Sequence, residues 1–126
     1  MMKVWAGEGK YSISLELIRC AEGAAVVLTG GEKPHLGAMV LAVPRQSLAG
    51  RDISCDSYVV PVPGHKDHLV ALPVAERLCR LLNEPVSVSA GIHIDHADEA
   101  ELVLLQENCR TALAMVVEQL SDAVIS

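Results

Sequence analysis

Aromatic side chains are scarce in this chain of 126 residues, where they make up 2% of the composition and phenylalanine is absent. The core must therefore be packed with aliphatic residues, and hydrophobic residues reach 51% of the chain. Basic residues are also few, since 10 Lys and Arg stand against 16 Asp and Glu. Proteins that bind nucleic acids select basic patches and stacking rings. These two shortages argue against a nucleic-acid-binding protein.

Cysteine motifs and long apolar runs are missing as well. Cys20, Cys55, Cys79 and Cys109 are scattered, without the C-x-x-C spacing of a zinc knuckle or a redox pair. We expect reduced, mostly buried thiols in a cytoplasmic protein. No apolar run reaches the roughly 18 residues that a membrane span requires. The length fits one domain over residues 1–126.

Alternating apolar and polar residues predict strands in the first half of the chain. Glycine and proline separate the runs, and the short connections favour an antiparallel meander. The four predicted strands are Lys10–Cys20, Ala24–Thr29, Gly37–Val43 and Ile53–Val62.

The apolar period changes in the second half. Residues Asp67–Leu82 suit a helix that Pro73 either bends or begins, and Val86–Ile94 alternates as a fifth strand. A long helix over Asp98–Val124 begins with a capping-box pattern. The predicted fold is α+β with two layers: a four-stranded antiparallel meander, a fifth strand after a crossover helix, and a long C-terminal helix packed on the sheet.

All five histidines fall in three short segments. KPHLG holds His35, GHKDH holds His65 and His68, and GIHIDH holds His93 and His96. Imidazole is the side chain best suited to binding metal and to transferring protons near neutral pH. The clustering therefore predicts a site, provided that the fold brings the segments together.

The strand directions indicate that it does. If the meander alternates and the first helix returns across the sheet, the fifth strand runs parallel to the fourth, and all three segments reach one rim. The N-termini of both helices lie there, where free N–H groups favour an anion. We expect a phosphorylated ligand, a divalent metal, or both. Neutral imidazoles of His35, His65 and His93 suit Zn, Fe or Ni.

Other residues complete this rim. Strand alternation places Asp95 on the same face as His93. Lys33 and Lys66 lie beside the histidines and are candidates for holding a phosphate. Because a lone histidine beside glycine is commonly a packing residue, only the convergence supports a site. The expected aliphatic walls are Leu36, Met39, Ile92 and Ile94.

Three separated strings resemble a known family: TGGEKPHLGAMVLA, GHKDH and VSAGIHIDHADEAEL, within about Thr29 to Leu105. The chain is similar to the LpdD-like prenylated-flavin chaperones, the small D subunits associated with gallate decarboxylase. The resemblance implies a non-catalytic, cytoplasmic accessory protein. Such a protein binds prenylated FMN and helps to deliver or mature it in a UbiD-type decarboxylase. It points to His35 with Gly37, to His65 with Lys66 and Asp67, and to His93 with Asp95, whereas His68 and His96 depart from the pattern.

Two alternatives stay open. One is a small metal-dependent enzyme in which His35, His65 and His93 hold the ion and Asp95 or Asp67 acts as the base. It predicts turnover without a flavin. The other is a purely structural subunit, in which the same histidines are packing residues and no ligand binds.

The final helix carries more apolar residues than one sheet-facing stripe requires. Val103, Leu104, Met115 and Val117 widen the stripe, and the mean hydropathy of +0.33 is high for a lone domain. We therefore predict a homo-oligomer, most simply a two-fold dimer, that uses the outer side of this helix or a free sheet edge. In the alternative, Val103 and Leu104 pack under the first helix.

Overall fold

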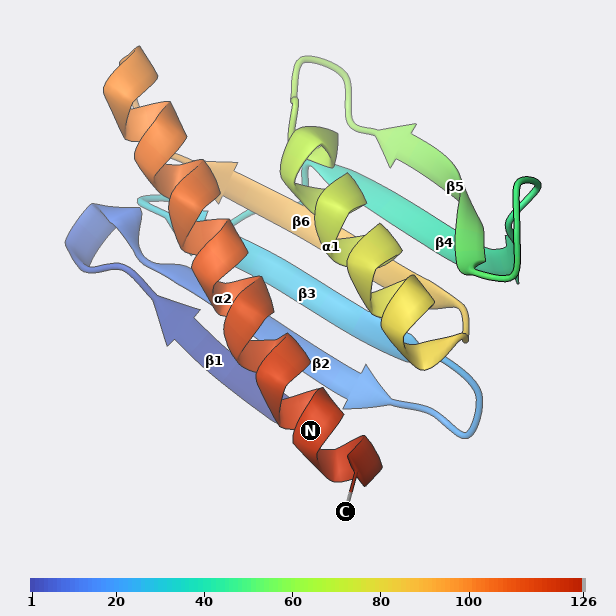
Figure 1. Ribbon diagram of the computed structural model, residues 1–126. Helices are drawn as coiled ribbons and strands as arrows, with labels where there is room; N and C mark the ends of the chain where they lie inside the picture. The colour runs from blue at the N-terminus through green and yellow to red at the C-terminus, as the bar shows by residue number, and fades with distance from the viewer. Residues whose placement is uncertain (126) are drawn as a thin grey trace.

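The computed structural model describes the backbone of residues 1–125 and the side chains of residues 1–122. It is a two-layer α+β fold in which both helices cover the same face of one six-stranded sheet (Figure 1). The predicted class and the long C-terminal helix on the sheet are confirmed. The strands are β1 (Met2–Ala6), β2 (Ile13–Arg19), β3 (Ala24–Gly31), β4 (Ala38–Gln46), β5 (Ile53–Pro61) and β6 (Val86–His93). The helices are α1 (His68–Leu82) and α2 (Glu99–Ile125), with a 3-10 turn over Gly9–Tyr11.

The strand order differs from a simple meander. The sheet runs β1-β2-β3-β6-β4-β5, so β6 lies between β3 and β4. It pairs parallel to β3 and antiparallel to β4. The expected pairing of β3 with β4 is therefore wrong. The loop between them passes over the end of β6, where the Gly37 N–H donates to the Ala90 carbonyl at 2.8 Å.

The strand at the N-terminal edge was not predicted from the sequence. β1 pairs antiparallel with β2, from Met2 opposite Leu17 to Ala6 opposite Ile13. Its alternation is visible in hindsight, since Val4 is buried and Trp5 is exposed. The strand has only five residues, one of them a lysine, so its alternation was too short to predict a strand.

The core lies between the helices and the sheet and is aliphatic, as the shortage of aromatic residues requires. In Figure 1, α1 crosses β6, β4 and β5, while α2 lies over β1 and β2, in agreement with their contacts. The capping box is confirmed, because the Glu101 N–H donates to Asp98 Oδ1 at 2.8 Å and the Asp98 N–H to Glu101 Oε1 at 3.2 Å. The largest fully buried side chains include Ile13, Leu15, Leu17, Leu28 and Leu78.

The outer side of α2 remains apolar and exposed. Val103, Leu104 and Met115 are 45%, 37% and 37% exposed, so the alternative that Val103 and Leu104 pack under α1 is wrong. Leu102 is also half exposed. Among the described residues, neither helix has the length and hydrophobicity of a membrane-spanning segment.

The face of the sheet opposite the helices is not covered by any described element (Figure 1). Its large apolar side chains come from five strands and are all exposed. We call this surface the open sheet face. It carries Trp5, Ile18, Val27, Met39, Leu41, Tyr58 and Val60.

Candidate functional site

The three histidine segments meet at one end of the sheet. The ring centroid of His35 lies 4.8 Å from that of His65 and 6.0 Å from that of His93. His35 comes from the β3–β4 loop, His65 from the loop before α1, and His93 from the end of β6. The convergence expected from strand direction is confirmed despite the different strand order. Both β5 and β6 run antiparallel to β4, so they still share one direction.

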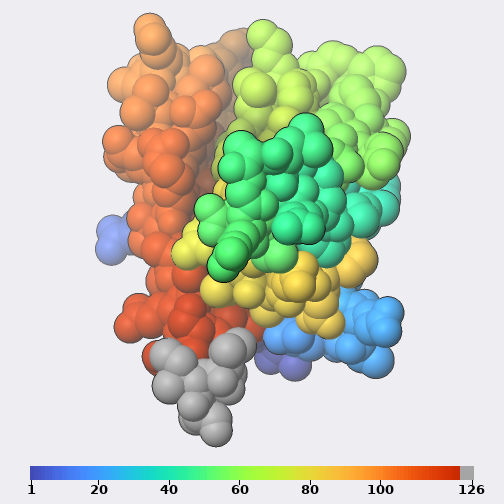
Figure 2. All heavy atoms as spheres, turned by 45° about the vertical axis from the view of Figure 1, so that its right-hand side comes forward, coloured from blue at the N-terminus to red at the C-terminus, as the bar shows by residue number. Residues whose placement is uncertain are grey.

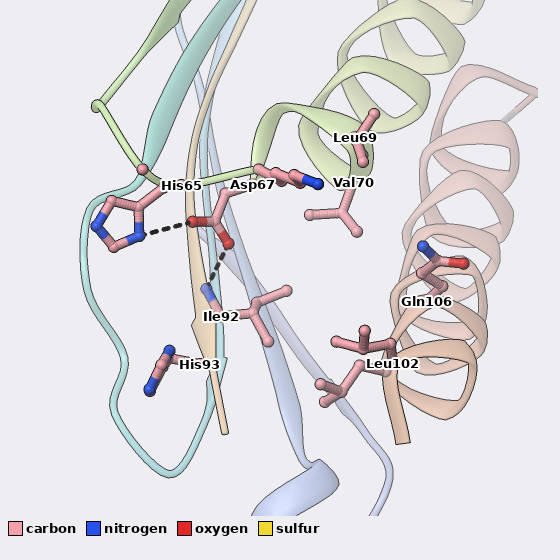
Figure 3. A pocket seen from close by; sticks show the side chains of 11 residues that line it. His65, Asp67, Leu69, Val70, Ile92, His93, Leu102 and Gln106 are labelled. Carbon is pink, nitrogen blue, oxygen red and sulfur yellow. Dashed lines mark hydrogen bonds and ion pairs between the residues drawn. The ribbon is translucent and has the colours of Figure 1, made fainter. Parts of the chain in front are cut away.

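Asp67 lies at the centre of this cluster. The residue is 8% exposed, and its carboxylate oxygen Oδ2 lies 3.1 Å from His35 Nε2 and 3.9 Å from His65 Nδ1. Oδ1 accepts the Ile92 N–H at 2.9 Å (Figure 3). Although Asp67 directly precedes α1, its side chain makes no capping hydrogen bond. This carboxylate therefore contacts the histidine cluster and does not cap the helix.

The hydrogen bonds of His35 indicate that the cluster attracts a cation. His35 Nδ1 lies 3.1 Å from the Lys33 carbonyl oxygen, while Nε2 faces the carboxylate of Asp67. Both partners are acceptors, and a neutral imidazole has only one N–H. A divalent cation held by His35 and Asp67 would satisfy both contacts with a neutral ring. Histidines that bind metals commonly donate the other ring N–H to a carbonyl, as His35 does to Lys33.

The residues present thus fit a divalent cation. The ligand atoms of His35, His65 and Asp67 all lie within 4.8 Å of one another. Asp67 takes the position in this group that the sequence had assigned to His93. The sequence had assigned Asp67 no place among the metal-ligand candidates, since an aspartate before a helix is usually a cap.

Two glycines permit this close packing. A Cβ on Gly37 would overlap Asp67 Oδ2 and crowd His35 Nε2, and a Cβ on Gly91 would overlap the His35 carbonyl. Gly37 was expected from the family resemblance, but Gly91 was not. Only a residue without a side chain fits at either position.

His93, Asp95 and Lys33 form a second polar group at the same rim. His93 Nε2 lies 2.9 Å from Asp95 Oδ1, and Lys33 Nζ lies 3.5 Å from Asp95 Oδ2. The hydrogen bond with His93, followed by the charge of Lys33, holds the pKa of Asp95 below its ordinary value. Strand alternation correctly placed His93 beside Asp95. Lys33 is already paired, whereas Lys66 forms no hydrogen bond or ion pair with the described residues and lines the neighbouring cavity.

His68 and His96 do not join the cluster. His68 is the first residue of α1, and its Nδ1 is buried without a hydrogen-bond partner among the described residues. His96 is exposed in a left-handed conformation with φ 54°. These two are the histidines that depart from the family pattern.

A cavity of about 270 Å³ lies beside the cluster, between the starts of α1 and α2 (Figure 3). One side is polar, with His65, Asp67 and His93. Of the four walls expected from the sequence, Ile92 lines it. The other three do not, because Ile94 is buried in the core, Met39 lies on the open sheet face, and Leu36 is exposed in a loop. The apolar side consists of Leu69, Val70, Ile92, Leu102 and Leu105.

Comparisons with known proteins agree with this picture. The model of the prenylated flavin chaperone LpdD-like domain matches residues 7–121. A crystal structure of a chaperone complex for yeast 20S proteasome assembly shares the fold, with a TM-score of 0.58 and 16% identity over 96% of this chain and 95% of that chain. A search of curated proteins finds no match. Because the family match spans nearly the whole chain, this protein belongs to the LpdD-like prenylated flavin chaperones.

Proposed function

We propose that this protein binds prenylated FMN at the histidine rim and delivers or matures it for a UbiD-type decarboxylase. The observation that carries the proposal is the cluster of His35, His65 and Asp67 beside a cavity with one apolar wall. Membership of the prenylated flavin chaperone family supports an accessory role. The protein itself performs no decarboxylation.

The rim and the cavity match different parts of such a ligand. Lys66 and the N-terminus of α1 favour the phosphate. The aliphatic wall, which includes Leu69 and Leu102, accepts the ring system or the prenyl group. The volume of about 270 Å³ lies below the roughly 300–1,000 Å³ of pockets that enclose a drug-sized ligand. Partial enclosure suits a carrier that must release its cargo.

A divalent metal completes the proposed site. His35, His65 and His93 supply imidazoles, and Asp67 adds a carboxylate oxygen. Imidazole ligands suit Zn, Fe or Ni. When bound, the ion supplies positive charge that attracts the phosphate. His93 lies farther from His35 than His65 does, so its ring is the outer member of the set.

The proposed partners follow from this role. The acceptor is the catalytic subunit of a UbiD-type decarboxylase, and the four free thiols suit the reducing cytoplasm. We also propose that the chain forms a homo-oligomer, most simply a two-fold dimer.

The metal-dependent enzyme is the weaker candidate because both potential bases are engaged. Asp67 accepts the Ile92 N–H and faces His35. Asp95 contacts both His93 and Lys33. These contacts hold both carboxylates against protein groups, and the family match favours an accessory role.

Titration with reduced prenylated FMN tests the main proposal. We expect saturable binding that weakens in Lys66→Ala and His93→Ala, because these changes remove a cation and an imidazole from the rim. His96→Ala is the matched control, since His96 is exposed and lies outside the cluster. Equal affinity in all variants argues against this site. Decarboxylation by the isolated chain contradicts the accessory role.

A further inference from the structure

A groove between α1 and α2 opens directly from the proposed flavin cavity. Leu69, Val70 and Gln106 line both the cavity and a hollow of about 150 Å³ behind it. Pro73 and Leu113 in turn line both that hollow and a wider part of about 840 Å³. Figure 2 shows the surface hollowed between α2, in orange, and the yellow-green start of α1. We call the whole depression the interhelical groove.

The floor of the interhelical groove is aliphatic and accessible. Leu69 is 53% exposed, and Leu72, Leu113 and Val117 are half-buried. Ala114, on α2, is exposed and has no side chain beyond Cβ to fill the space. An open trough between two helices is the shape that accepts the apolar face of a third helix.

Arginines border this floor. Arg77, Arg80 and Arg110 all line its wide part. Arg77 and Arg110 form no ion pair or hydrogen bond with any residue in the described part of the chain, whereas Arg80 contacts Cys55 Sγ at 3.9 Å. These unpaired cations lie in a chain whose net charge is −6.

The acidic residues of the groove do not cancel this charge. Glu76 accepts a hydrogen bond from the Ser57 hydroxyl at 2.9 Å, so its carboxylate is turned toward β5. Apart from Glu76, the lining of the wide part contains one carboxylate, that of Glu118, and three guanidinium groups. The interhelical groove therefore has an apolar floor and a basic border.

We propose that the interhelical groove docks an amphipathic helix of the enzyme that receives the flavin, with an apolar stripe toward the floor and acidic residues on its flanks. This proposal rests on the proposed function. Opposite charges across an interface fix the register and speed the encounter. Since the groove continues into the cavity, a helix bound there lies next to the cofactor to be transferred.

Binding without cofactor tests the docking surface separately from the flavin site. The probe is the cofactor-free form of a UbiD-type decarboxylase, with affinity measured by biolayer interferometry. The double variant Arg77→Glu/Arg110→Glu is expected to bind about tenfold more weakly at low salt. The difference should shrink at high salt, where exposed charges are screened. Arg51→Glu is the control for each single reversal, Arg77→Glu or Arg110→Glu, because Arg51 is exposed in the β4–β5 loop and the change of charge is the same.

A second variant separates groove occupancy from simple charge attraction. Ala114→Arg adds a cation but fills the trough, and arginine is a good helix former. Docking in the groove predicts weaker binding, whereas general attraction to a basic surface predicts stronger binding. Stronger binding by Ala114→Arg overturns the proposal.

Other outcomes remain distinguishable. The groove variants should bind the flavin with the same affinity as the unaltered chain, since Arg77, Arg110 and Ala114 do not line the cavity. Absence of flavin binding by the unaltered chain refutes the proposed function and leaves the docking measurement intact. Equal docking by the charge-reversed variant and its control refutes the groove. If light scattering gives the free variant a different mass from the unaltered chain, the groove is an interface between copies of this chain. That result also overturns the proposal.

Discussion

At the scale of single residues, the position of Asp67 decides what the rim can bind. Its carboxylate is buried beside two imidazoles, and burial of a carboxylate costs free energy unless cations or N–H groups compensate. The Ile92 N–H supplies one partner. The metal ion that we propose at His35, His65 and Asp67 would supply the rest of the compensation.

The proposed metal site predicts a clear mutational pattern. His35→Ala, His65→Ala and Asp67→Asn should each lose most of the bound divalent metal, because each removes a ligand atom from the group. His93→Ala should lose less, since His93 lies farther from His35. Elemental analysis of protein purified without a polyhistidine tag measures this. His68→Ala and His96→Ala are the controls. Full metal in the first three variants excludes the site.

The thiols give a second prediction at this scale. Burial raises the pKa of Cys79 to about 11 and that of Cys109 to about 12. Because the thiolate is the reactive form, both should resist alkylation in the folded protein at about pH 8. Cys20 is exposed and should react first. Mass spectrometry of peptides after timed labelling tests the order, and equal rates for Cys20 and Cys109 contradict it.

The raised pKa values of Cys79 and Cys109 also determine how the free energy of unfolding changes with pH. An unfolded thiol ionises near its ordinary value of 9.0, whereas the folded thiols stay neutral to about 11 and about 12. Ionisation of the unfolded chain therefore lowers the free energy of unfolding as the pH rises above 9.0. Below that pH the contribution of these two thiols is fully present.

Part of the site was predictable from the sequence, and the reasons are physical. His35, His65 and His93 were found because imidazoles are rare and their clustering is visible in one dimension. Asp67 was assigned no ligand role, since which way its carboxylate turns depends on Ile92, 25 residues away in the sequence. Met39 was wrongly assigned to the cavity wall because Met39 and Ile92 point to opposite faces of the sheet. Which face borders the cavity depends on where the helices pack.

At the scale of elements, strand direction was easier to predict than strand order. The direction of a strand follows from the reversal of direction between successive strands, and it does not depend on which strands are paired. The histidine segments were therefore placed at the correct end of the sheet. Order depends on pairing between distant segments. The alternation of β6, with buried valines and intervening serines, suits an edge as well as the centre of a sheet. Nothing local marks β6 as the strand between β3 and β4.

The insertion of β6 has a consequence for the site. Since β6 runs parallel to β3, its end lies beside the end of β3, with Gly31 opposite His93. The Glu32 and Lys33 N–H groups both donate to the His93 carbonyl, at 2.8 and 3.2 Å. The loop that carries His35 is thereby anchored to the strand that carries His93. With β6 beyond β5, as a meander would place it, β4 and β5 would lie between β3 and β6.

At the scale of the whole molecule, the open sheet face is an apolar surface that no described element covers. β3 and β6 form a parallel pair, and parallel strands are normally covered on both sides. Exposed apolar patches of this kind mark interaction sites. The charged residues on this face pair with each other, as Lys3 does with Glu16 and Arg45 with Asp56, each at 2.8 Å. A neutral, apolar surface of this kind suits a second copy of the chain.

The dimer predicted from the sequence therefore has three candidate surfaces: the outer side of α2, a free edge of the sheet, and the open sheet face. Two substitutions separate the helix from the sheet face, because Leu41 and Leu104 are similarly accessible, at 42% and 37% exposed. We expect light scattering to give twice the monomer mass of 13.4 kDa for the unaltered chain. Leu41→Glu should return the mass to that of the monomer, since it places a charge in the middle of an apolar contact, whereas Leu104→Glu should not. The opposite pattern assigns the contact to α2, and a monomer that persists at high protein concentration rules out the dimer.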